Sequence, residues 1–234
     1  MVSSYTEVLA RIFNAKKGIM VTGSHGKTTS AAMLGRVLEA AGWDPTVLVG
    51  GELLEWGRTA RAGPAPPAGG WMVVEGDEYQ AKILQMHPHA LLITNVDYDH
   101  PDFFPTKKDY ESLFNELGGR TAKEGGIVLT GPFDPGELGD IKLKVCGEHN
   151  RINAAGVFKM ARLLGIEEAT IKKALSDFRG TRRRMELYTQ EDADIVVMDD
   201  YAHHPTEIRA TLRALREQYP TRRIVAVFQP HTYS

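Results

Sequence analysis

The sequence has very little cysteine, no long hydrophobic run and no excess of positive charge. A single cysteine among 234 residues excludes an internal disulfide and is typical of a reducing compartment. Residues 1–17 lack the continuous apolar stretch of a signal peptide, and no later run approaches the length of a membrane span. The formal net charge of -2 provides no broad basic surface for nucleic acid. We therefore expect a cytoplasmic protein that binds neither membranes nor nucleic acid.

What the sequence does contain is typical of a globular α/β protein. Hydrophobic residues make up 42% of the chain and charged residues 25%, enough for a sizeable core. Short apolar runs alternate with segments of helical spacing, which favours a mainly parallel sheet flanked by helices. Strands are predicted at 18–22, 46–49, 71–75, 90–94, 125–130 and 141–145, and helices at 27–41, 150–164 and 167–178. The proline- and glycine-rich range 61–70 is predicted to be a surface loop.

A domain boundary is predicted near Gly180, where the last of these helices ends. Beyond it, apolar runs at 194–198 and 223–228 flank a helix that Pro205 can begin. This pattern predicts one β-α-β unit, too small to bury both faces of its sheet. We expect a complete domain over 1–179 and the incomplete start of a second, Rossmann-like α/β domain over 180–234.

A glycine-rich loop lies where the first strand meets the first helix. Its residues are Gly23, Ser24, His25, Gly26, Lys27, Thr28 and Thr29. Backbone N–H groups and the helix dipole at such a junction attract phosphate, so Lys27 is expected at the β- and γ-phosphates of ATP and Thr28 at Mg²⁺. Only the second half of the general Walker pattern is matched, because Val21 stands near its first glycine. A glycine turn that merely caps a helix is the alternative.

Polar side chains follow two of the predicted strands. Glu75 ends one strand and His100 comes shortly after another, at the carboxyl edge where parallel sheets bind ligands. Glu75 is a candidate metal ligand, and His100 a second one, although Mg²⁺ prefers oxygen. Acidic turns often only solvate strand ends, and we favour that interpretation for Asp77, Asp97 and Asp99 taken singly.

Five segments together resemble the Mur ligase family in order and spacing. They are GSHGKTT (23–29), EGDE (75–78), TNVDYDH (94–100), GEHNRINAA (147–155) and DDYAHHPTE (199–207). The shortened phosphate loop is that family's own variant, and the resemblance extends from about Gly18 to Tyr233. It implies an ATP-dependent amide ligase of peptidoglycan precursor synthesis, with a central ATP-binding domain over 1–179 and an incomplete C-terminal domain over 180–234.

The resemblance also implies roles for single residues. Lys27 and Arg184 would contact the ATP phosphates, while Thr28, Glu75 and His100 would organise Mg²⁺. Lys27, Glu75, His100 and Arg184 are thus the implied catalytic residues. His149, Asn150 and Asn153 would lie beside the adenine, and Asp200 would bind the ribose. His203 and His204 would face the substrate.

Simpler interpretations of some of these residues stay open. Asn150 and Asn153 could cap the helix they begin, and the run 182–184 could be a solvated basic turn. The roles of Arg182, Arg183, His203 and His204 are not fixed by the resemblance.

Within the family, three stretches are most similar to members that join L-alanine to UDP-N-acetylmuramate. They are TNVDYDHPDFF (94–104), the pair 183–184, and FQPHT (228–232). A member that recycles an intact peptide onto the same sugar nucleotide is the second choice. A P-loop kinase or ATPase, a polyglutamate-forming ligase and a non-catalytic ATP-binding remnant remain alternatives.

The sequence departs from the family in three places. No uridine-nucleotide domain precedes the phosphate loop, and the segment 130–146 is shorter than usual. No lysine occurs from Asp109 to Ala122, where some members carry a modified lysine near the metal. These departures predict either a fragment of a longer enzyme or a truncated relative.

Overall fold

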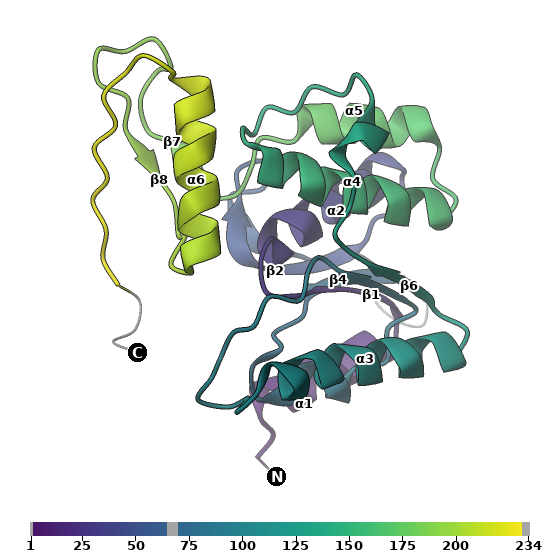
Figure 1. Cartoon of the computed structure of the whole chain (residues 1–234). Coiled ribbons are helices and arrows are strands. Elements are labelled where there is room, and N and C mark those ends of the chain that lie inside the picture. The colour runs from purple at the N-terminus through teal and green to yellow at the C-terminus, as the bar shows by residue number, and fades with distance from the viewer. Residues whose placement is uncertain (1, 65–69, 231–234) are drawn as a thin grey trace.

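The computed structural model describes residues 2–64 and 70–230, and its centre is a six-stranded sheet in the order β3-β2-β4-β1-β5-β6 (Figure 1). The strands are β1 (Lys17–Thr22), β2 (Thr46–Leu53), β3 (Arg58–Arg61), β4 (Trp71–Glu75), β5 (Ala90–Ile93) and β6 (Ile127–Thr130). All neighbours pair in parallel except β2 and β3, which are antiparallel. The predicted α/β fold with a mainly parallel sheet is confirmed.

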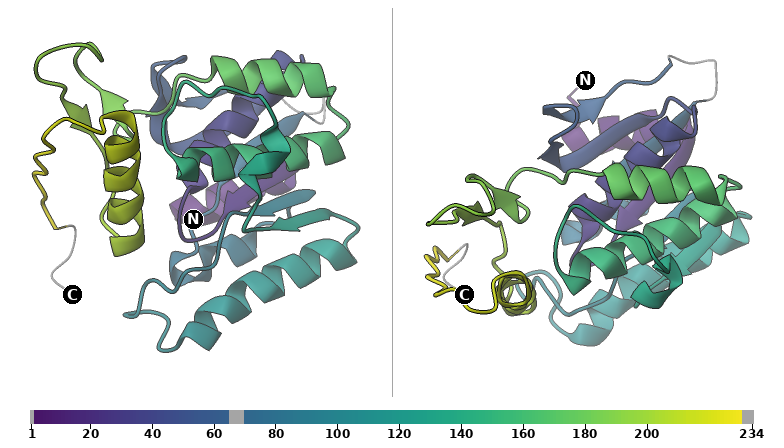
Figure 2. Two further views of the ribbon diagram at one scale, coloured as in Figure 1. Left: turned by 45° about the horizontal axis from the view of Figure 1, so that its top comes forward. Right: turned by 90° about the horizontal axis from the view of Figure 1, so that it is seen from above.

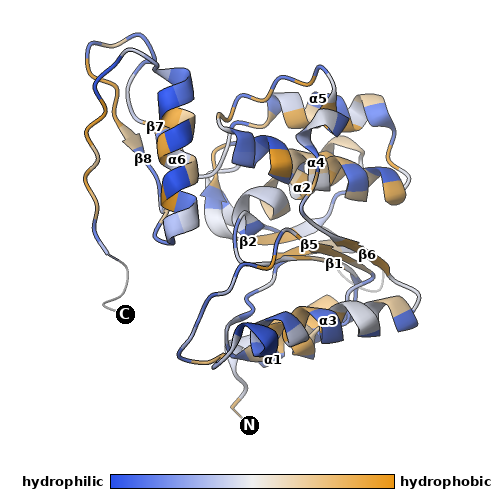
Figure 3. Cartoon of the chain, viewed as in Figure 1, coloured by the Kyte–Doolittle hydropathy of each residue, from blue (hydrophilic) through white to orange (hydrophobic). Residues whose placement is uncertain are grey.

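Helices cover both faces of this sheet (Figures 1 and 2). One face carries α1 (Tyr5–Asn14) and α3 (Lys107–Lys123), and the other carries α2 (Lys27–Ala40), α4 (Glu148–Leu163) and α5 (Glu168–Asp177). Because both faces are covered, the central strands β1, β4 and β5 are mostly apolar and buried along their length (Figure 3). Two short 3₁₀ helices, Tyr79–Gln85 and Pro135–Leu138, lie in the connections.

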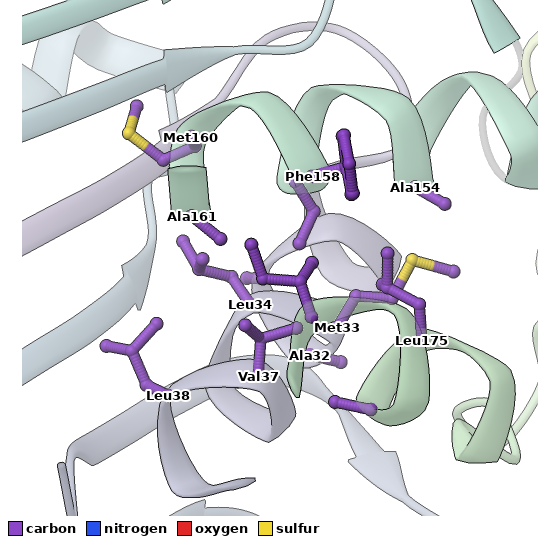
Figure 4. Close-up of a cluster of buried hydrophobic side chains, with 14 of the residues drawn as sticks. Ala32, Met33, Leu34, Val37, Leu38, Ala154, Phe158, Met160, Ala161 and Leu175 are labelled. Atoms are coloured by element: carbon purple, nitrogen blue, oxygen red, sulfur yellow. The ribbon is translucent and has the colours of Figure 1, made fainter. Parts of the chain in front are cut away.

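Helix α2 is the most deeply enclosed element. It packs between the sheet and the pair α4 and α5, so Met33, Leu34, Val37 and Leu38 are all inaccessible to solvent (Figure 4). Most residues of α2 from Thr28 to Leu38 are therefore buried, rather than those of one stripe alone. The glycine-rich loop is thereby joined to a rigid helix in the centre of the fold.

Three elements of this layered fold were not predicted from the sequence, and one predicted strand is wrong. Helices α1 and α3 each begin with a capping box, and β3 forms an antiparallel edge. The range 141–145 is irregular because its apolar residues pack against the core below α4 instead of pairing with a strand. The carbonyl of Ile141 accepts from Arg151, 3.1 Å away.

The region after 180 differs most from the prediction. The helix α6 (Pro205–Gln218) begins at Pro205 as expected, but β7 (Glu186–Leu187) and β8 (Met198–Asp199) form an antiparallel pair. Residues 223–228 are irregular, and their backbone does not pair with any strand in the described part of the chain. Of the two strands predicted for the β-α-β unit, the first is reduced to β8 and the second, over 223–228, is not formed. Parts of the expected loop 61–70 and of the 228–232 motif lie outside the described residues. No helix in the described ranges has the length and apolar character that crossing a membrane requires.

Candidate nucleotide-binding site

The glycine-rich loop connects β1 to α2 at the middle of the sheet. Gly23 and Gly26 have φ values of 123° and 77°, which favour glycine. A Cβ at Gly26 would lie 2.2 Å from Oδ1 of Asn153, so the loop backbone and α4 approach too closely for a side chain. Gly26 is also the N-cap of α2 and supplies no side-chain hydrogen bond to the first turn of the helix. The loop thus presents bare backbone at a helix N-terminus, the arrangement that binds phosphate.

Lys27 points back into this loop. Its Nζ donates to the carbonyls of Gly23 (2.6 Å) and Ser24 (3.0 Å) and to Oε1 of Glu78 (2.9 Å). Glu78 is 1% exposed, and its other oxygen, Oε2, has no hydrogen-bond partner within the described structure. A buried carboxylate therefore balances the charge of the lysine expected to meet the ATP phosphates.

Thr28 and Glu75 lie in contact next to Lys27. The Thr28 hydroxyl donates to Oε1 of Glu75 (2.8 Å), and the second carboxylate oxygen of Glu75 accepts from the Gly50 backbone N–H. His100 lies in the same cavity, with Nε2 3.4 Å from Oε1 of Glu78. That hydrogen bond raises the pKa of His100, helped by the charge of Asp99. A hydroxyl and several carboxylates are hard oxygen donors that fit Mg²⁺.

These groups line a cavity of about 460 Å³. Of the candidate residues it includes Ser24, His25, Gly26, Lys27, Thr28, Thr29, Glu75, His100, Arg184, His203 and His204. The structure therefore brings the expected phosphate and metal residues to one place at the carboxyl edge of the sheet.

A second cavity of about 630 Å³ adjoins the same loop. It is lined by His149, Asn150 and Asn153 from α4, by Asp200, and by residues of α6. His25, Gly26, Thr29, Arg184 and Glu207 line both cavities, so one elongated ligand can reach from the first into the second.

The asparagines of α4 do not cap that helix. Its N-cap is Gly147, without a side-chain hydrogen bond, while Asn150 Nδ2 donates to the Cys146 carbonyl (2.7 Å). Asn150 and Asn153 are 5% and 8% exposed. Partial burial lowers the pKa of neighbouring His149, which favours the neutral imidazole that can both donate and accept. The capping interpretation is therefore wrong for both asparagines.

Only one residue of the basic run 182–184 lines the cavities. Arg182 donates to Glu52 of β2 (2.8 Å), and Arg183 forms an ion pair with Asp199 (3.5 Å). Arg184 lines both cavities and lies 5.4 Å from the ring centre of Tyr201. The carboxylate of Asp200 accepts from the Met185 backbone N–H (2.8 Å), which holds it beside the second cavity.

Several contributing residues were not singled out from the sequence. Asn95 holds the loop in shape, since its backbone carbonyl accepts from Ser24 N–H (3.2 Å) and its Oδ1 from His25 N–H (3.0 Å). Glu78 and Glu207 also contribute to the site and were not singled out. Asn95 and Glu78 stand in motifs that follow strands, but nothing in a linear pattern shows that a carboxylate is buried against Lys27.

Asp97, which we expected only to solvate a strand end, has specific partners instead. Its Oδ2 contacts His25 Nε2 (3.1 Å) and accepts from the Thr206 hydroxyl (2.9 Å). It thus joins the phosphate loop to the start of α6, and the expectation of a purely solvating role is wrong.

Comparison with known proteins places this geometry in a family. A profile of the Mur ligase middle domain matches residues 21–135, and one of the Mur ligase glutamate ligase domain matches residues 183–233. Together the two profiles match more than half of the chain.

Curated relatives carry one name. The UDP-N-acetylmuramate–L-alanine ligase of Synechococcus sp. (strain JA-3-3Ab) is 37% identical over 266 aligned positions, covering 97% of this chain and 51% of the relative. That of Desulfitobacterium hafniense (strain Y51) is 35% identical, with 100% of this chain and 60% of the relative covered. The chain thus spans only about half to three fifths of the length of these relatives.

Solved structures agree. A crystal structure of UDP-N-acetylmuramate–alanine ligase from Thermotoga maritima has a TM-score of 0.80 at 30% identity, covering 97% of this chain and 59% of that one. A murein peptide ligase from Psychrobacter arcticus, at 23% identity and a TM-score of 0.71, shares the fold, with 98% and 61% covered. With both domain profiles, these relatives and the two adjoining cavities in agreement, the chain belongs to the Mur ligase family.

Proposed function

We propose that this chain takes part in ATP-dependent amide bond formation in peptidoglycan precursor synthesis, joining L-alanine to UDP-N-acetylmuramate. The observation that carries the proposal is the pair of adjoining cavities that share His25, Gly26, Thr29, Arg184 and Glu207. The names of the relatives supply the substrates. Such nucleotide substrates belong to the cytoplasm, where we place the activity.

The nucleotide would lie across both cavities. Its phosphates would meet the Gly26 backbone and Lys27, with Arg184 between the two cavities, and its adenosine would lie between α4 and Asp200. To bind the phosphates, Lys27 would replace its hydrogen bonds to the loop carbonyls with hydrogen bonds to phosphate oxygens. Its ion pair with Glu78 would be kept and would continue to balance the lysine charge. Thr28, Glu75 and His100 would hold Mg²⁺, which supplies charge neutralisation at the phosphates.

The proposed reaction proceeds through an acyl phosphate. The substrate carboxylate attacks the γ-phosphate, ADP leaves, and the amino group of L-alanine then displaces phosphate to form the amide. Lys27 and Arg184 would stabilise the charge on the transferred phosphoryl group. The residues around 200–207, which adjoin both cavities, would exclude water from the acyl phosphate. We further propose that the domain division lies near residue 180.

The decisive experiment measures ADP release by the purified chain with Mg-ATP, UDP-N-acetylmuramate and L-alanine, omitting each component in turn. We expect release to require both substrates and to be lost in Lys27→Ala but kept in Lys108→Ala, which changes an exposed lysine on α3. Release that needs an intact peptide in place of L-alanine would identify a recycling ligase.

A binding measurement separates catalysis from nucleotide recognition. Calorimetry with Mg-ATP should show binding that Lys27→Ala weakens by about 10- to 100-fold, the effect of losing a hydrogen bond to a charged group. Binding without substrate-dependent ADP release would leave a nucleotide-binding remnant as the function. Turnover of ATP without any carboxylate substrate would instead contradict the ligase assignment.

A further inference from the structure

Two imidazoles and a carboxylate meet where α6 packs against the phosphate loop. They belong to His25, Asp97 and His204, and one potential ligand atom from each lies within 4.8 Å of the other two. The rings of His25 and His204 have centroids 4.6 Å apart, and His25 Nε2 lies 3.1 Å from Asp97 Oδ2. Because the three residues come from distant segments, the cluster exists only while the start of α6 is in place.

The donor set favours a different cation from that of the proposed Mg²⁺ position. Zn²⁺ binds histidine nitrogen and carboxylate oxygen at about 2.0–2.2 Å in four-coordinate sites, whereas Mg²⁺ prefers oxygen alone. Tetrahedral ligands at those bond lengths lie about 3.4 Å apart, so ligand atoms now up to 4.8 Å apart would have to close in by up to about 1.4 Å. All three residues are only partly buried, which leaves room for that movement and for a water in the fourth position.

The cluster also has supporting hydrogen bonds of the kind that surround metal sites. Glu207 Oε1 lies 3.3 Å from Nδ1 of His25, the ring nitrogen opposite to the one facing Asp97. A carboxylate in that position orients a ligating imidazole and raises its basicity. The Thr206 hydroxyl donates to Asp97 Oδ2 (2.9 Å) and fixes the carboxylate in the same way.

The charges around His25 already favour a cation there. Carboxylate oxygens of Glu207 and Asp97 lie 3.3 Å and 3.1 Å from the two ring nitrogens of His25. Nδ1 of His204 accepts a hydrogen bond from the Thr206 backbone N–H at 3.3 Å. This bond is long, so losing it would cost little when the ring binds a metal through its other nitrogen.

We propose that His25, Asp97 and His204 form a binding site for a borderline divalent cation such as Zn²⁺, separate from the position at Thr28, Glu75 and His100. A cation there connects the phosphate loop, the segment after β5 and the start of α6, and so holds α6 against the loop. The proposal does not depend on the ligase activity.

The test is a Zn²⁺ titration of the full chain against a chromogenic chelator, with Co²⁺ absorption as a second readout of tetrahedral coordination. We expect one site per chain that excess Mg²⁺ does not displace. His204→Gln should abolish this site, whereas the matched control His100→Gln, which removes an imidazole of the same cavity that is not part of the cluster, should keep it. Glu207→Gln should weaken it by about 10- to 100-fold, as for other outer-shell partners.

Three results would overturn the proposal. Loss of the site in His100→Gln with retention in His204→Gln would place Zn²⁺ at the position formed by Thr28, Glu75 and His100. Retention in both variants would mean binding by other histidines. A folded wild-type chain, verified by circular dichroism, that takes up no Zn²⁺ would exclude the site altogether.

Discussion

Glu78 illustrates how one buried carboxylate supports the loop. It contacts Lys27 at 2.9 Å while 1% exposed. We expect Glu78→Gln to lower the free energy of unfolding by about 2 kcal/mol, less than the roughly 3–5 kcal/mol typical of fully buried pairs, because Lys27 keeps some contact with water. Urea denaturation measures this change.

The matched control is the neighbouring pair formed by Asp77 and Lys82, which is far more exposed. Asp77→Asn should cost less than about 1 kcal/mol, as exposed ion pairs do. Equal losses for Glu78→Gln and Asp77→Asn would contradict the structural role assigned to Glu78.

His149 provides a pH-dependent prediction. Because burial lowers its folded-state pKa below 6.5, the unfolded chain takes up the proton first as the pH falls. Its contribution to stability is therefore intact above about pH 6.5 and is lost progressively below it, down to the folded pKa. Melting curves of wild type and His149→Gln should diverge below pH 6.5, with the wild type losing more stability. The control variant is His87→Gln, because His87 is exposed. If instead His149→Gln lost more stability than the wild type below pH 6.5, His149 would not be held neutral in the folded chain.

At the scale of elements, the junction between β1 and α2 depends on Gly26. Gly26→Ala introduces a Cβ 2.2 Å from Asn153 Oδ1 in addition to a strained backbone at φ 77°. Gly42 has nearly the same φ, 76°, but a Cβ added there would meet nothing within 4 Å. Gly42→Ala should therefore cost only the backbone strain of about 1–2 kcal/mol, and Gly26→Ala clearly more.

The two glycine variants also differ in their effect on ligand binding. Gly26→Ala pushes α4 and the loop apart, so Mg-ATP affinity should fall, whereas Gly42→Ala lies away from both cavities and should leave affinity unchanged. Thermal melting and calorimetry measure the two effects. Similar behaviour of both variants would mean that the close approach of Asn153 to the loop is unimportant.

At the scale of the whole molecule, α6 is held to the rest by few contacts. Glu207 and Thr206 contact His25 and Asp97, Arg213 forms an ion pair with Glu148 (3.2 Å), and Ala214 is buried. Among the described residues after 182, only Met185 and Ala214 are buried hydrophobics. Polar contacts at the phosphate loop therefore contribute much of the attachment of α6.

We expect Glu207→Gln to increase the exchange rate of α6 backbone amides, because it removes the charged partner of His25. The charges of His25 and other nearby cations outweigh burial and hold the pKa of Glu207 at about 2, so the carboxylate is ionised at neutral pH. Hydrogen exchange by mass spectrometry measures the change. Glu217→Gln is the control, since Glu217 pairs with Arg213 within α6 itself, and equal acceleration in both variants would rule out a specific role for Glu207.

Much of the fold was predictable because its signals are local. Apolar runs and helical periodicity located β1, β4, β5, α2 and α5 to within about one residue, since buried parallel strands and core helices are marked by their own composition. The predicted strands at 141–145 and 223–228 did not form, because a strand also needs a second strand that pairs with its backbone. The linear sequence pattern does not show whether such a strand is present.

The sequence by itself determined the family, the order of the motifs and the residue types at the candidate site, because these are properties of the chain read in one dimension. Only the tertiary structure decided which residues meet. It set Glu78 against Lys27, turned Arg182 away from the cavities, and brought His25, Asp97 and Glu207 together across 182 positions of sequence separation. Burial and partner choice are consequences of packing in three dimensions, and packing depends on all segments at once.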